Sequence, residues 1–504
     1  MASDVSFNNI PGNLLVPFFY AEINSGGSPY ANQPRLLLVG PKLAGGSASV
    51  AAVYGPIQSA AEADAQFGVG SVLAWMYRVA RKNAPFQPIW AQPLADPAGS
   101  AAAGSITLPA PGVTAAAILQ ILGRDVPFQI NAGDSASTVA ANAVLAINAL
   151  NLPVTAAQDG TTPAKVNVTC KHVGAIGNGL ELGIATDQPN VLTSGNTTVV
   201  AMSGGTGVPT LSAALANLGD AEYDFIASPY GDTQSLNAFR DFFSDSSGRW
   251  SPMQQLYGHH QTAAFGNLST LVTLGTVRND QHGSIMGSQA APNPSWEWAA
   301  ALAAVESVHL ANAPELSRPL KTLPLNGILP PRDRSLWFDK TDRQALYADG
   351  ISGYTVDVDG TVRIDRVVTT YRQTAAGVPD STFRNINTMF QSMFASRYFR
   401  SAVSNKHARQ ALADDNPFNL SEITTPSDIR DTVVHAAGDL VALGVIENLD
   451  IFSQYVVVKR DPLNADRVNG FLPIDVVNQL NIFAANITVY EQYTTASGAV
   501  AVPA

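Results

Sequence analysis

The stretch that decides the fold is Glu222–Leu310, in which EYDFIASPYG starts at residue 222, TAAFG at residue 262, SIMG at residue 284 and NPSWEW at residue 293. The first three contain short apolar runs that end in a Ser-Pro or Gly turn, which predicts a strand at each. Apolar residues at helical spacing predict helices over residues 236–243, 268–277 and 299–310. Strands that alternate with helices predict a parallel α/β sheet.

The last of these helices carries the clearest start signal. We expect Asn293 to cap it and Pro294 to take its first helical position, where a missing backbone N–H does no harm. Residues 299–310 are apolar on nearly every side and rich in alanine. This helix is therefore expected to be buried on several sides.

Composition sets the scale and excludes some classes of protein. With 504 residues, and about 100–200 residues per domain, three or four domains are expected. Charged residues make up 14% of the chain, below the usual ~25%, so small polar residues or copies of the same chain must cover much of the surface. A net charge of -11 argues against nucleic-acid binding. The single cysteine, Cys170, excludes an internal disulfide.

The hydropathy pattern bears on localisation. No apolar run reaches the ~18–20 residues that a membrane span needs. The apolar stretch 14–23 has no Lys or Arg before Arg35, so it lacks the charged flank of a signal peptide. We expect a protein that is made in the cytoplasm and has no membrane contact.

The pattern along the chain predicts five parts. These are an N-terminal arm at 1–34, a central α/β domain at 35–96 and 208–378, an inserted β-rich domain at 97–207, an α+β C-terminal domain at 379–493 and a flexible tail at 494–504. The insertion is inferred because the α/β alternation stops near residue 97 and resumes at Leu211. Between these points the chain is rich in Ala, Thr, Gly and Val.

Shorter signals place the remaining elements. Strands are expected at 36–39, 88–91, 105–108, 127–130, 165–168, 198–200, 455–458 and 487–490, and helices at 72–81, 137–150, 381–412 and 427–443. An Asp-Gly pair between alternating runs predicts a hairpin across residues 357–362.

Three patterns resemble binding motifs, and each has a simpler interpretation. The glycine-rich loop 39–47 has Gly46 where a phosphate-binding loop needs its Lys. Residues 357–360 resemble a calcium loop, but in that register the last ligand position is Arg366, which cannot supply a carboxylate. Adjacent His259 and His260 point to opposite faces of a strand and cannot share a metal. We therefore expect no metal and no cofactor.

The enzymatic alternative is a serine hydrolase. Asp224, His259 and Ser284 occur in that order at predicted strand ends. The Gly-x-Ser-x-Gly elbow of α/β-hydrolases is absent from the sequence, so the order alone is a weak signal. We expect no enzymatic activity.

Two features point towards assembly. Residues 14–20 are strongly apolar but are followed by the flexible stretch 24–29, so this strand either packs on its own domain or joins the sheet edge of a neighbouring subunit. The predicted helix 381–412 is basic, with no acidic residue from Ser381 to Ala413. In an acidic protein this indicates either a contact with an acidic surface or a solvated helix face.

Six stretches together carry a family resemblance. They are YDFIASPY at 223–230, RWSPM at 249–253, RNDQH at 278–282, PSWEWAA at 294–300, QYVVVKRD at 454–461 and FLPI at 471–474. In combination, and over nearly the whole chain, they resemble the contractile-tail sheath proteins of bacteriophages, specifically the Mu-like branch.

The resemblance implies an architecture and a set of contact residues. It implies a non-catalytic central sheath domain of subtilisin-like topology, an inserted outer domain, a C-terminal domain that faces the inner tail tube, and arms that exchange strands between subunits. The implied exchange positions are Val16, Phe18, Phe19, Tyr20, Ile23, Ile487, Val489 and Tyr490 in the arms and Tyr455, Val456, Val457 and Val458 at the receiving edge. The candidates for tube contact are Arg397, Arg400, Lys406 and Arg409.

The function implied by the resemblance is mechanical. The chain would polymerise as stacked hexameric rings around the tail tube, and contraction would drive the tube through the host envelope for genome delivery. Expected partners are further copies of the chain, the tail tube protein, and baseplate and tail terminator proteins, with no direct nucleic-acid contact. Assembly is expected in the host cytoplasm and the final location in the virion tail. The sheath of a contractile bacteriocin or injection particle is the alternative.

Overall fold

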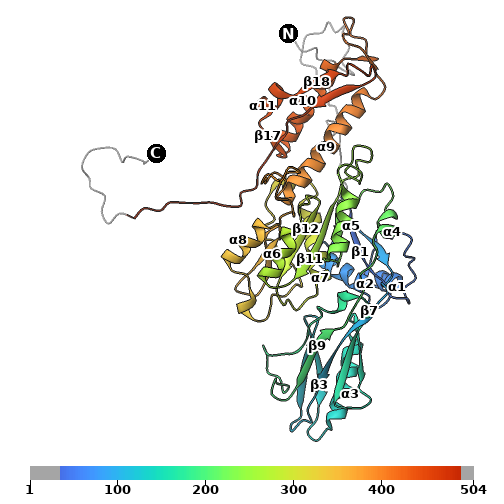
Figure 1. The fold of residues 1–504 in the computed structure, drawn as a ribbon, viewed down its shortest axis with the longest axis vertical. Helices are drawn as coiled ribbons and strands as arrows, with labels where there is room; N and C mark the ends of the chain where they lie inside the picture. Colours follow the sequence, from blue (N-terminus) through green and yellow to red (C-terminus); the bar gives the residue numbers. More distant parts are fainter. Residues whose placement is uncertain (1–33, 490–504) are drawn as a thin grey trace, which may run out of the picture.

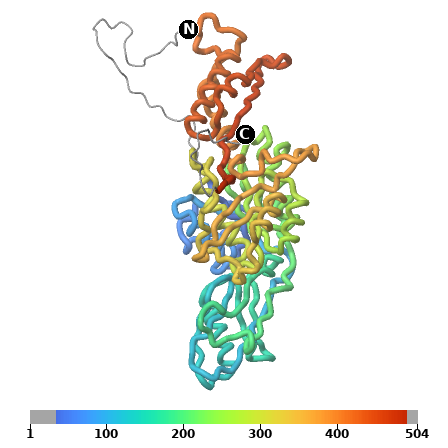
Figure 2. The backbone as a smooth tube through the Cα atoms, turned by 90° about the vertical axis from the view of Figure 1, so that its left-hand side faces the viewer, coloured from blue at the N-terminus to red at the C-terminus, as the bar shows by residue number. Residues whose placement is uncertain are grey.

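The computed structural model describes residues 34–489, which form an elongated molecule of three successive parts (Figure 1). A parallel sheet and its helices lie in the middle. Residues 101–203, coloured teal, form one end, and the orange and red residues of the C-terminal part form the other, in both Figure 1 and Figure 2. No helix within residues 34–489 is long and apolar enough to cross a membrane.

The middle part is built on a five-stranded parallel sheet. Its strands are β1 (Leu36–Pro41), β2 (Ile89–Leu94), β10 (Phe225–Ala227), β11 (His259–Phe265) and β12 (Gly283–Ser288), in the spatial order β12-β11-β10-β1-β2. The chain leaves this sheet after β2 and returns at β10 on the other side of β1, where Leu36 lies opposite Phe225. This confirms the predicted parallel α/β sheet. The structure adds that β1, which precedes residues 101–203, and β10, which follows them, are neighbours in it.

Helices cover both faces of the sheet. The helices of this part are α1 (Ala60–Phe67), α2 (Val72–Asn83), α4 (Ser212–Ala216), α5 (Thr233–Phe243), α6 (Leu268–Thr276), α7 (Ser295–His309) and α8 (Lys340–Ala348). In β1, Leu36 and Leu38 pack in one core with α2 and α7, whereas Leu37 and Val39 pack in another with α5. A strand buried on both faces explains why four consecutive positions are apolar.

Helix α7 is buried on nearly every side, as expected from its composition. Trp296 and Trp298 are fully buried, and so are the alanines that follow them. Its start differs from the prediction, because the cap is Pro294 and the helix begins at Ser295. The Asn293 side chain instead donates to Glu297 Oε2 at 2.7 Å, so it holds a side chain within the helix rather than its first N–H groups.

Residues 101–203 form two antiparallel sheets and one helix. The sheets have the orders β6-β7-β3-β9 and β5-β4-β8. The elements are β3 (Ala101–Thr107), β4 (Ala115–Ile121), β5 (Arg124–Ile130), α3 (Ala136–Ala149), β6 (Val154–Gln158), β7 (Lys165–Val173), β8 (Leu182–Ile184) and β9 (Thr198–Ser203). The sequence pattern does not predict β4, β6 and β8, because short or alanine-rich strands carry little alternation.

The predicted hairpin is present in the middle part. Strands β13 (Gly353–Val356) and β14 (Val362–Arg366) pair antiparallel. Gly360 has φ +84°, which a residue with a side chain rarely adopts. This glycine therefore allows the turn, and the calcium-like pattern has a purely structural explanation.

The C-terminal part is α+β. Its elements are α9 (Ile386–His407), β15 (Ala411–Leu412), β16 (Ile423–Thr424), α10 (Pro426–Ala442), β17 (Ile446–Glu447), α11 (Leu449–Tyr455), β18 (Val457–Arg460), β19 (Val468–Phe471) and β20 (Asp475–Val476). One prediction is wrong here. Tyr455 ends helix α11 instead of starting a strand, because Phe452 and its neighbours form the last turn of a helix packed on α10. Residues 487–489 have no strand partner within the described chain, and residue 490 lies outside it, so the strand expected at 487–490 stays a prediction.

Helix α9 enters two hydrophobic cores (Figure 1). Its first half packs against the central sheet, where Phe390 stacks on Phe225 with ring centres 4.5 Å apart. Its second half packs against α10 and α11, and Phe399 stacks on Phe452. The change of core lies between Met393 and Phe394, inside one continuous helix. The middle and C-terminal parts are therefore joined by a rigid element at this point.

Candidate functional site

The three residues considered for serine hydrolysis do not form a catalytic triad. Nε2 of His259 lies 3.0 Å from Oγ of Ser284, and both side chains are fully buried. The Asp224 carboxylate is occupied by Arg397 and by the backbone N–H of Arg35. Because burial lowers the pKa of His259 well below its usual value and no solvent reaches Ser284, this pair is a neutral contact within the core.

The two adjacent histidines point to opposite faces of β11. His260 stacks on Phe239 of α5, and its Nε2 lies 2.8 Å from Oγ of Ser228. His259 faces Phe390 of α9. Burial lowers the pKa of His260 to about 3, so its ring is neutral at physiological pH. Within residues 34–489, no group of three or more His, Cys, Asp or Glu side chains is placed to hold a metal.

The glycine-rich loop after β1 is closed on itself. Nζ of Lys42 donates to the carbonyls of Gly46 and Ala48, both at 2.7 Å. A Cβ on Gly46 would lie 2.4 Å from the carbonyl oxygen of Gln66. The glycine is needed for this close approach to the end of α1, and the lysine ammonium is occupied by two carbonyls of its own loop.

The four basic residues predicted to contact the tail tube do not share one environment. Arg397 is 4% exposed and pairs with both Asp224 and Glu222, on the approach to β10. This overturns the assignment of Arg397 to a tube-facing surface, because two carboxylates of the same chain already neutralise its charge. Arg400 is half-exposed and lies 3.6 Å from Glu222 and 3.3 Å from Oε1 of Gln255.

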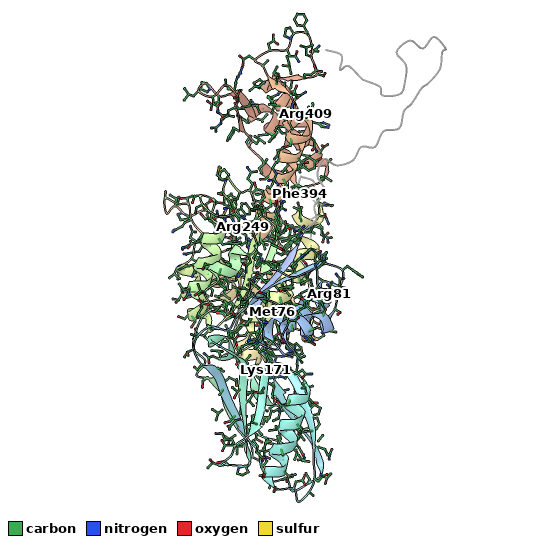
Figure 3. All side chains as sticks on the ribbon, turned by 90° about the vertical axis from the view of Figure 1, so that its right-hand side faces the viewer. Met76, Arg81, Lys171, Arg249, Phe394 and Arg409 are labelled. Carbon is green, nitrogen blue, oxygen red and sulfur yellow. The ribbon has the colours of Figure 1, made fainter. Side chains whose placement is uncertain are left out.

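The two remaining basic candidates lie at the far end of the helix. Lys406 and Arg409 are exposed, and Figure 3 shows Arg409 well beyond Phe394, towards the outer end of the C-terminal part. The adjoining loop exposes Phe418 and Leu420. The same loop exposes Asp414, Asp415 and Glu422, so this end of the molecule combines charges of both signs with exposed apolar groups.

The hairpin β18–β19 offers open strand edges. Val457 pairs with Phe471, and both side chains are exposed on the outer face. Val458 faces inward, against the core that α10 and α11 share. Among the described residues the two strands pair only with each other, so each has one edge free of backbone partners. Val456 is buried and precedes the strand.

The segment after β20 is apolar and leaves the body of the molecule (Figure 1). Leu480, Ile482, Phe483, Ile487 and Val489 are each at least 72% exposed. The sequence reasoning did not identify the first three, although the alternation of Leu480 with Ile482 matches that of Ile487 with Val489 and is a signal for a half-buried strand. The other arm candidates, Val16, Phe18, Phe19, Tyr20, Ile23 and Tyr490, lie outside the described residues.

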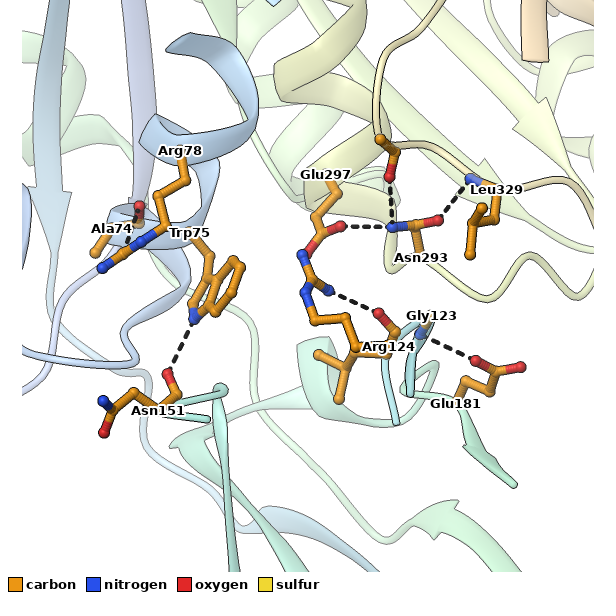
Figure 4. A network of polar contacts seen from close by, with 12 residues as sticks. Ala74, Trp75, Arg78, Gly123, Arg124, Asn151, Glu181, Asn293, Glu297 and Leu329 are labelled. Atoms are coloured by element: carbon orange, nitrogen blue, oxygen red, sulfur yellow. Dashed lines mark hydrogen bonds and ion pairs between the residues drawn. The ribbon is translucent and has the colours of Figure 1, made fainter. Parts of the chain in front are cut away.

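A separate polar network fixes the opposite end of the molecule (Figure 4). Arg124 of β5 lies over the Trp75 ring of α2 and donates to Glu297 of α7 at 2.8 Å. Nε1 of Trp75 donates to the carbonyl of Asn151. A buried ion pair and a stacked cation therefore hold residues 101–203 against the middle part.

Two open hollows flank the double connection between these parts. Their volumes are about 360 and 450 Å³, and Pro97, Val208 and Pro209 line both. The candidate residues discussed above lie elsewhere.

Comparison with known proteins gives one consistent result. Residues 204–370 match the phage tail sheath protein central domain, and residues 378–490 match the phage tail sheath C-terminal domain. A Mu-like prophage FluMu tail sheath protein of Haemophilus influenzae is 32% identical over 490 residues, which is 95% of this chain and 98% of that protein.

Solved structures with a similar course of the chain include three sheath proteins. The sheath tail protein of Desulfitobacterium hafniense has a TM-score of 0.48 at 12% identity and covers 92% of this chain and 97% of its own. That of Listeria innocua has a TM-score of 0.46 at 12% identity and covers 89% and 93%. The helical sheath of the anti-feeding prophage in its contracted state has a TM-score of 0.47 at 12% identity and covers 94% and 98%.

Proposed function

The chain belongs to the phage tail sheath family, and we propose that it polymerises through its two ends into the contractile sheath around a tail tube. One observation carries the role of the ends. Residues 482–489 present Ile482, Phe483, Ile487 and Val489 to solvent, on a segment that leaves its own subunit (Figure 1). Burying each large apolar side chain contributes about 1.5–3 kcal/mol, so the segment is strongly driven to find a partner surface.

The partner surface in this proposal is the hairpin β18–β19 of another copy. An added strand would supply backbone hydrogen bonds to a free edge, and Val457 and Phe471 would receive its apolar side chains. Residues Ile487 and Val489 share one face of an extended chain because successive side chains alternate. Val16–Ile23 of the N-terminal arm is proposed to join in the same way.

Such exchange makes a lattice. A contact between two different surfaces repeats from copy to copy and builds rings or open helices, here proposed as stacked hexameric rings. Contraction then needs no bound nucleotide if the extended lattice is metastable and moves to a better-packed state by rigid-body motion. The exchanged strands keep subunits connected during this motion.

The remaining partners are part of the same proposal. Lys406 and Arg409, together with the half-exposed Arg400, are proposed to contact an acidic surface of the tail tube protein. Baseplate and tail terminator proteins are proposed at the two ends of the sheath, with assembly in the host cytoplasm and a final place in the virion tail. The parallel order of the central sheet and its helices on both faces are compatible with the subtilisin-like topology that we propose for this part.

The sheath of a contractile bacteriocin or injection particle is the second candidate. The genes that accompany this one distinguish the two.

For hydrolysis, a fluorophosphonate probe is expected to leave the protein unlabelled because Ser284 is fully buried. Labelling that Ser284→Ala abolishes would support an enzyme instead.

Electron microscopy of the purified full-length chain tests the proposal. The wild type is expected to form rings or tubes, and Ile487→Ser with Val489→Ser is expected to reduce polymer yield at least tenfold. The matched control is Val358→Ser, which removes an equally exposed valine from a hairpin in the middle part. A wild type that remains monomeric at high concentration beside its tube protein would refute strand exchange.

A further inference from the structure

The point at which the N-terminal residues join the body is fixed by polar contacts. Oδ2 of Asp224 accepts the backbone N–H of Arg35 at 3.0 Å, and the carbonyl of Pro34 accepts the Gln87 side chain at 2.7 Å. The other oxygen of Asp224 pairs with Arg397 of α9. One carboxylate therefore joins the first described residues to helix α9.

The point at which the C-terminal segment leaves is fixed by the same helix. Nε2 of Gln391, a fully buried residue of α9, donates to the carbonyl of Val477 at 2.7 Å. It also lies 2.9 Å from Oγ of Ser317. Residues 478–489 begin immediately after this contact, so Gln391 holds the root of the exposed segment.

We propose that helix α9 transmits force directly between the two ends of the chain, with the Asp224–Arg397 pair and Gln391 as its two anchors. This rests on the proposed strand exchange, in which both ends are held by neighbouring subunits. Gln391 and Arg397 are six residues apart, about 9 Å along a helix that rises ~1.5 Å per residue. A pull on one arm therefore reaches the other through less than two turns of one rigid element.

The chemistry of the anchors suits this role. Both are buried, so water does not compete for their hydrogen bonds. The Asp224–Arg397 contact is in addition charge-assisted, and salt screens a buried pair little, whereas Gln391 and Val477 are joined by a neutral hydrogen bond. The inserted part is attached elsewhere, through Arg124 and Glu297. It lies outside the route from arm to arm, so its attachment is not required for the lattice to carry tension.

The test compares assembled sheaths under mechanical stress. Asp224→Asn and Gln391→Leu each remove one anchor, and Glu297→Gln is the matched control because it weakens a buried carboxylate–guanidinium pair off the route. Sheaths assembled around the tube protein are sheared and their fragment lengths measured by electron microscopy. Each anchor variant is sheared at the same interval below the unfolding temperature of its own subunit as the control, and is expected to give fragments at least threefold shorter than those of the control.

The outcomes separate this inference from the proposed function. Anchor variants that resist shear as well as Glu297→Gln would overturn the inference and leave strand exchange intact, whereas a wild type whose assembly does not depend on residues 482–489 would refute strand exchange itself. Should Asp224→Asn fail to fold, Arg397→Lys serves in its place. With that variant, exchange of the Arg35 amide hydrogen is expected to rise at least fivefold without a general rise over β1, and an unchanged rate overturns the inference.

Discussion

Asp224, on the approach to β10, and Arg397 of α9 form a buried ion pair across 173 positions of sequence. The Arg397 guanidinium also reaches Glu222, so two carboxylates from one segment enclose it. In the sequence alone, the same arginine is part of a helix without acidic residues and looks available to a partner. Its neutralising charges come from the central sheet, and the pair joins two parts of the subunit.

Removal of Arg397 is expected to destabilise the fold. The Arg397→Met variant leaves Asp224 and Glu222 without their buried counter-charge, and breaking such a pair costs about 3–5 kcal/mol. Arg400→Met is the control: its side chain is 44% exposed, and exposed pairs contribute only about 0–1 kcal/mol. Urea unfolding of both variants measures the difference, and equal losses would contradict the assignment of Arg397 to the interior.

How much of the fold could be predicted depends on where each element finds its partner. Strands β10, β11 and β12 are readable because each is a short apolar run closed by Gly or Ser-Pro, and the turn residues act locally. Strand β8 has three residues and is held by pairing with β4, more than 60 positions away, so its own sequence carries almost no signal.

For the candidate site too, some residues could be predicted from the sequence and others could not. Exposed apolar residues such as Ile487 and Val489 are visible in the sequence because their pattern requires a partner. The separation of Arg397 from Lys406 and Arg409 is not visible, because burial of one end of α9 depends on Asp224, which lies far away in the chain. Long-range charge pairing leaves no local pattern.

The loop after β1 offers a sharp test of packing. Gly46→Ala places a methyl group 2.4 Å from the Gln66 carbonyl oxygen, so the end of α1 must move, at a cost of about 1–3 kcal/mol. Gly45→Ala, at the adjacent position, meets nothing within 4 Å and is expected to change stability by less than about 0.5 kcal/mol. Thermal or urea unfolding checks both, and similar values for the two would contradict the described loop.

Glu306 of α7 predicts a pH dependence of stability. It is fully buried, and burial raises its pKa well above 4.5. The folded state therefore keeps a proton that the unfolded chain releases. Below pH 4.5 both states are protonated, and the group does not lower the free energy of unfolding. As the pH rises from 4.5 towards the folded pKa, the free energy of unfolding falls. Glu306→Gln removes this titration. The free energy of unfolding of the variant minus that of the wild type is therefore expected to increase from pH 5 to pH 8.

The control for this measurement is Glu447→Gln, at an exposed position. Since all other groups titrate alike in the wild type and the variant, the difference between the two curves isolates one carboxyl. A difference that is flat between pH 5 and pH 8 would show that Glu306 is ionised in the folded protein.

The outer end of α9 distinguishes a tube contact from a solvated helix face. Lys406→Glu with Arg409→Glu reverses two exposed charges, so subunit stability is expected to change by less than about 0.5 kcal/mol while co-sedimentation with the tube protein falls severalfold. Arg334→Glu with Lys340→Glu is the matched control, because it reverses two exposed charges in the middle part. Since surface charges are screened by salt, the wild type should lose co-sedimentation between low and high ionic strength more steeply than the α9 variant. If the α9 variant binds the tube as the control does, the basic end of the helix is solvated and the tube contact lies elsewhere, even though the sheath still polymerises.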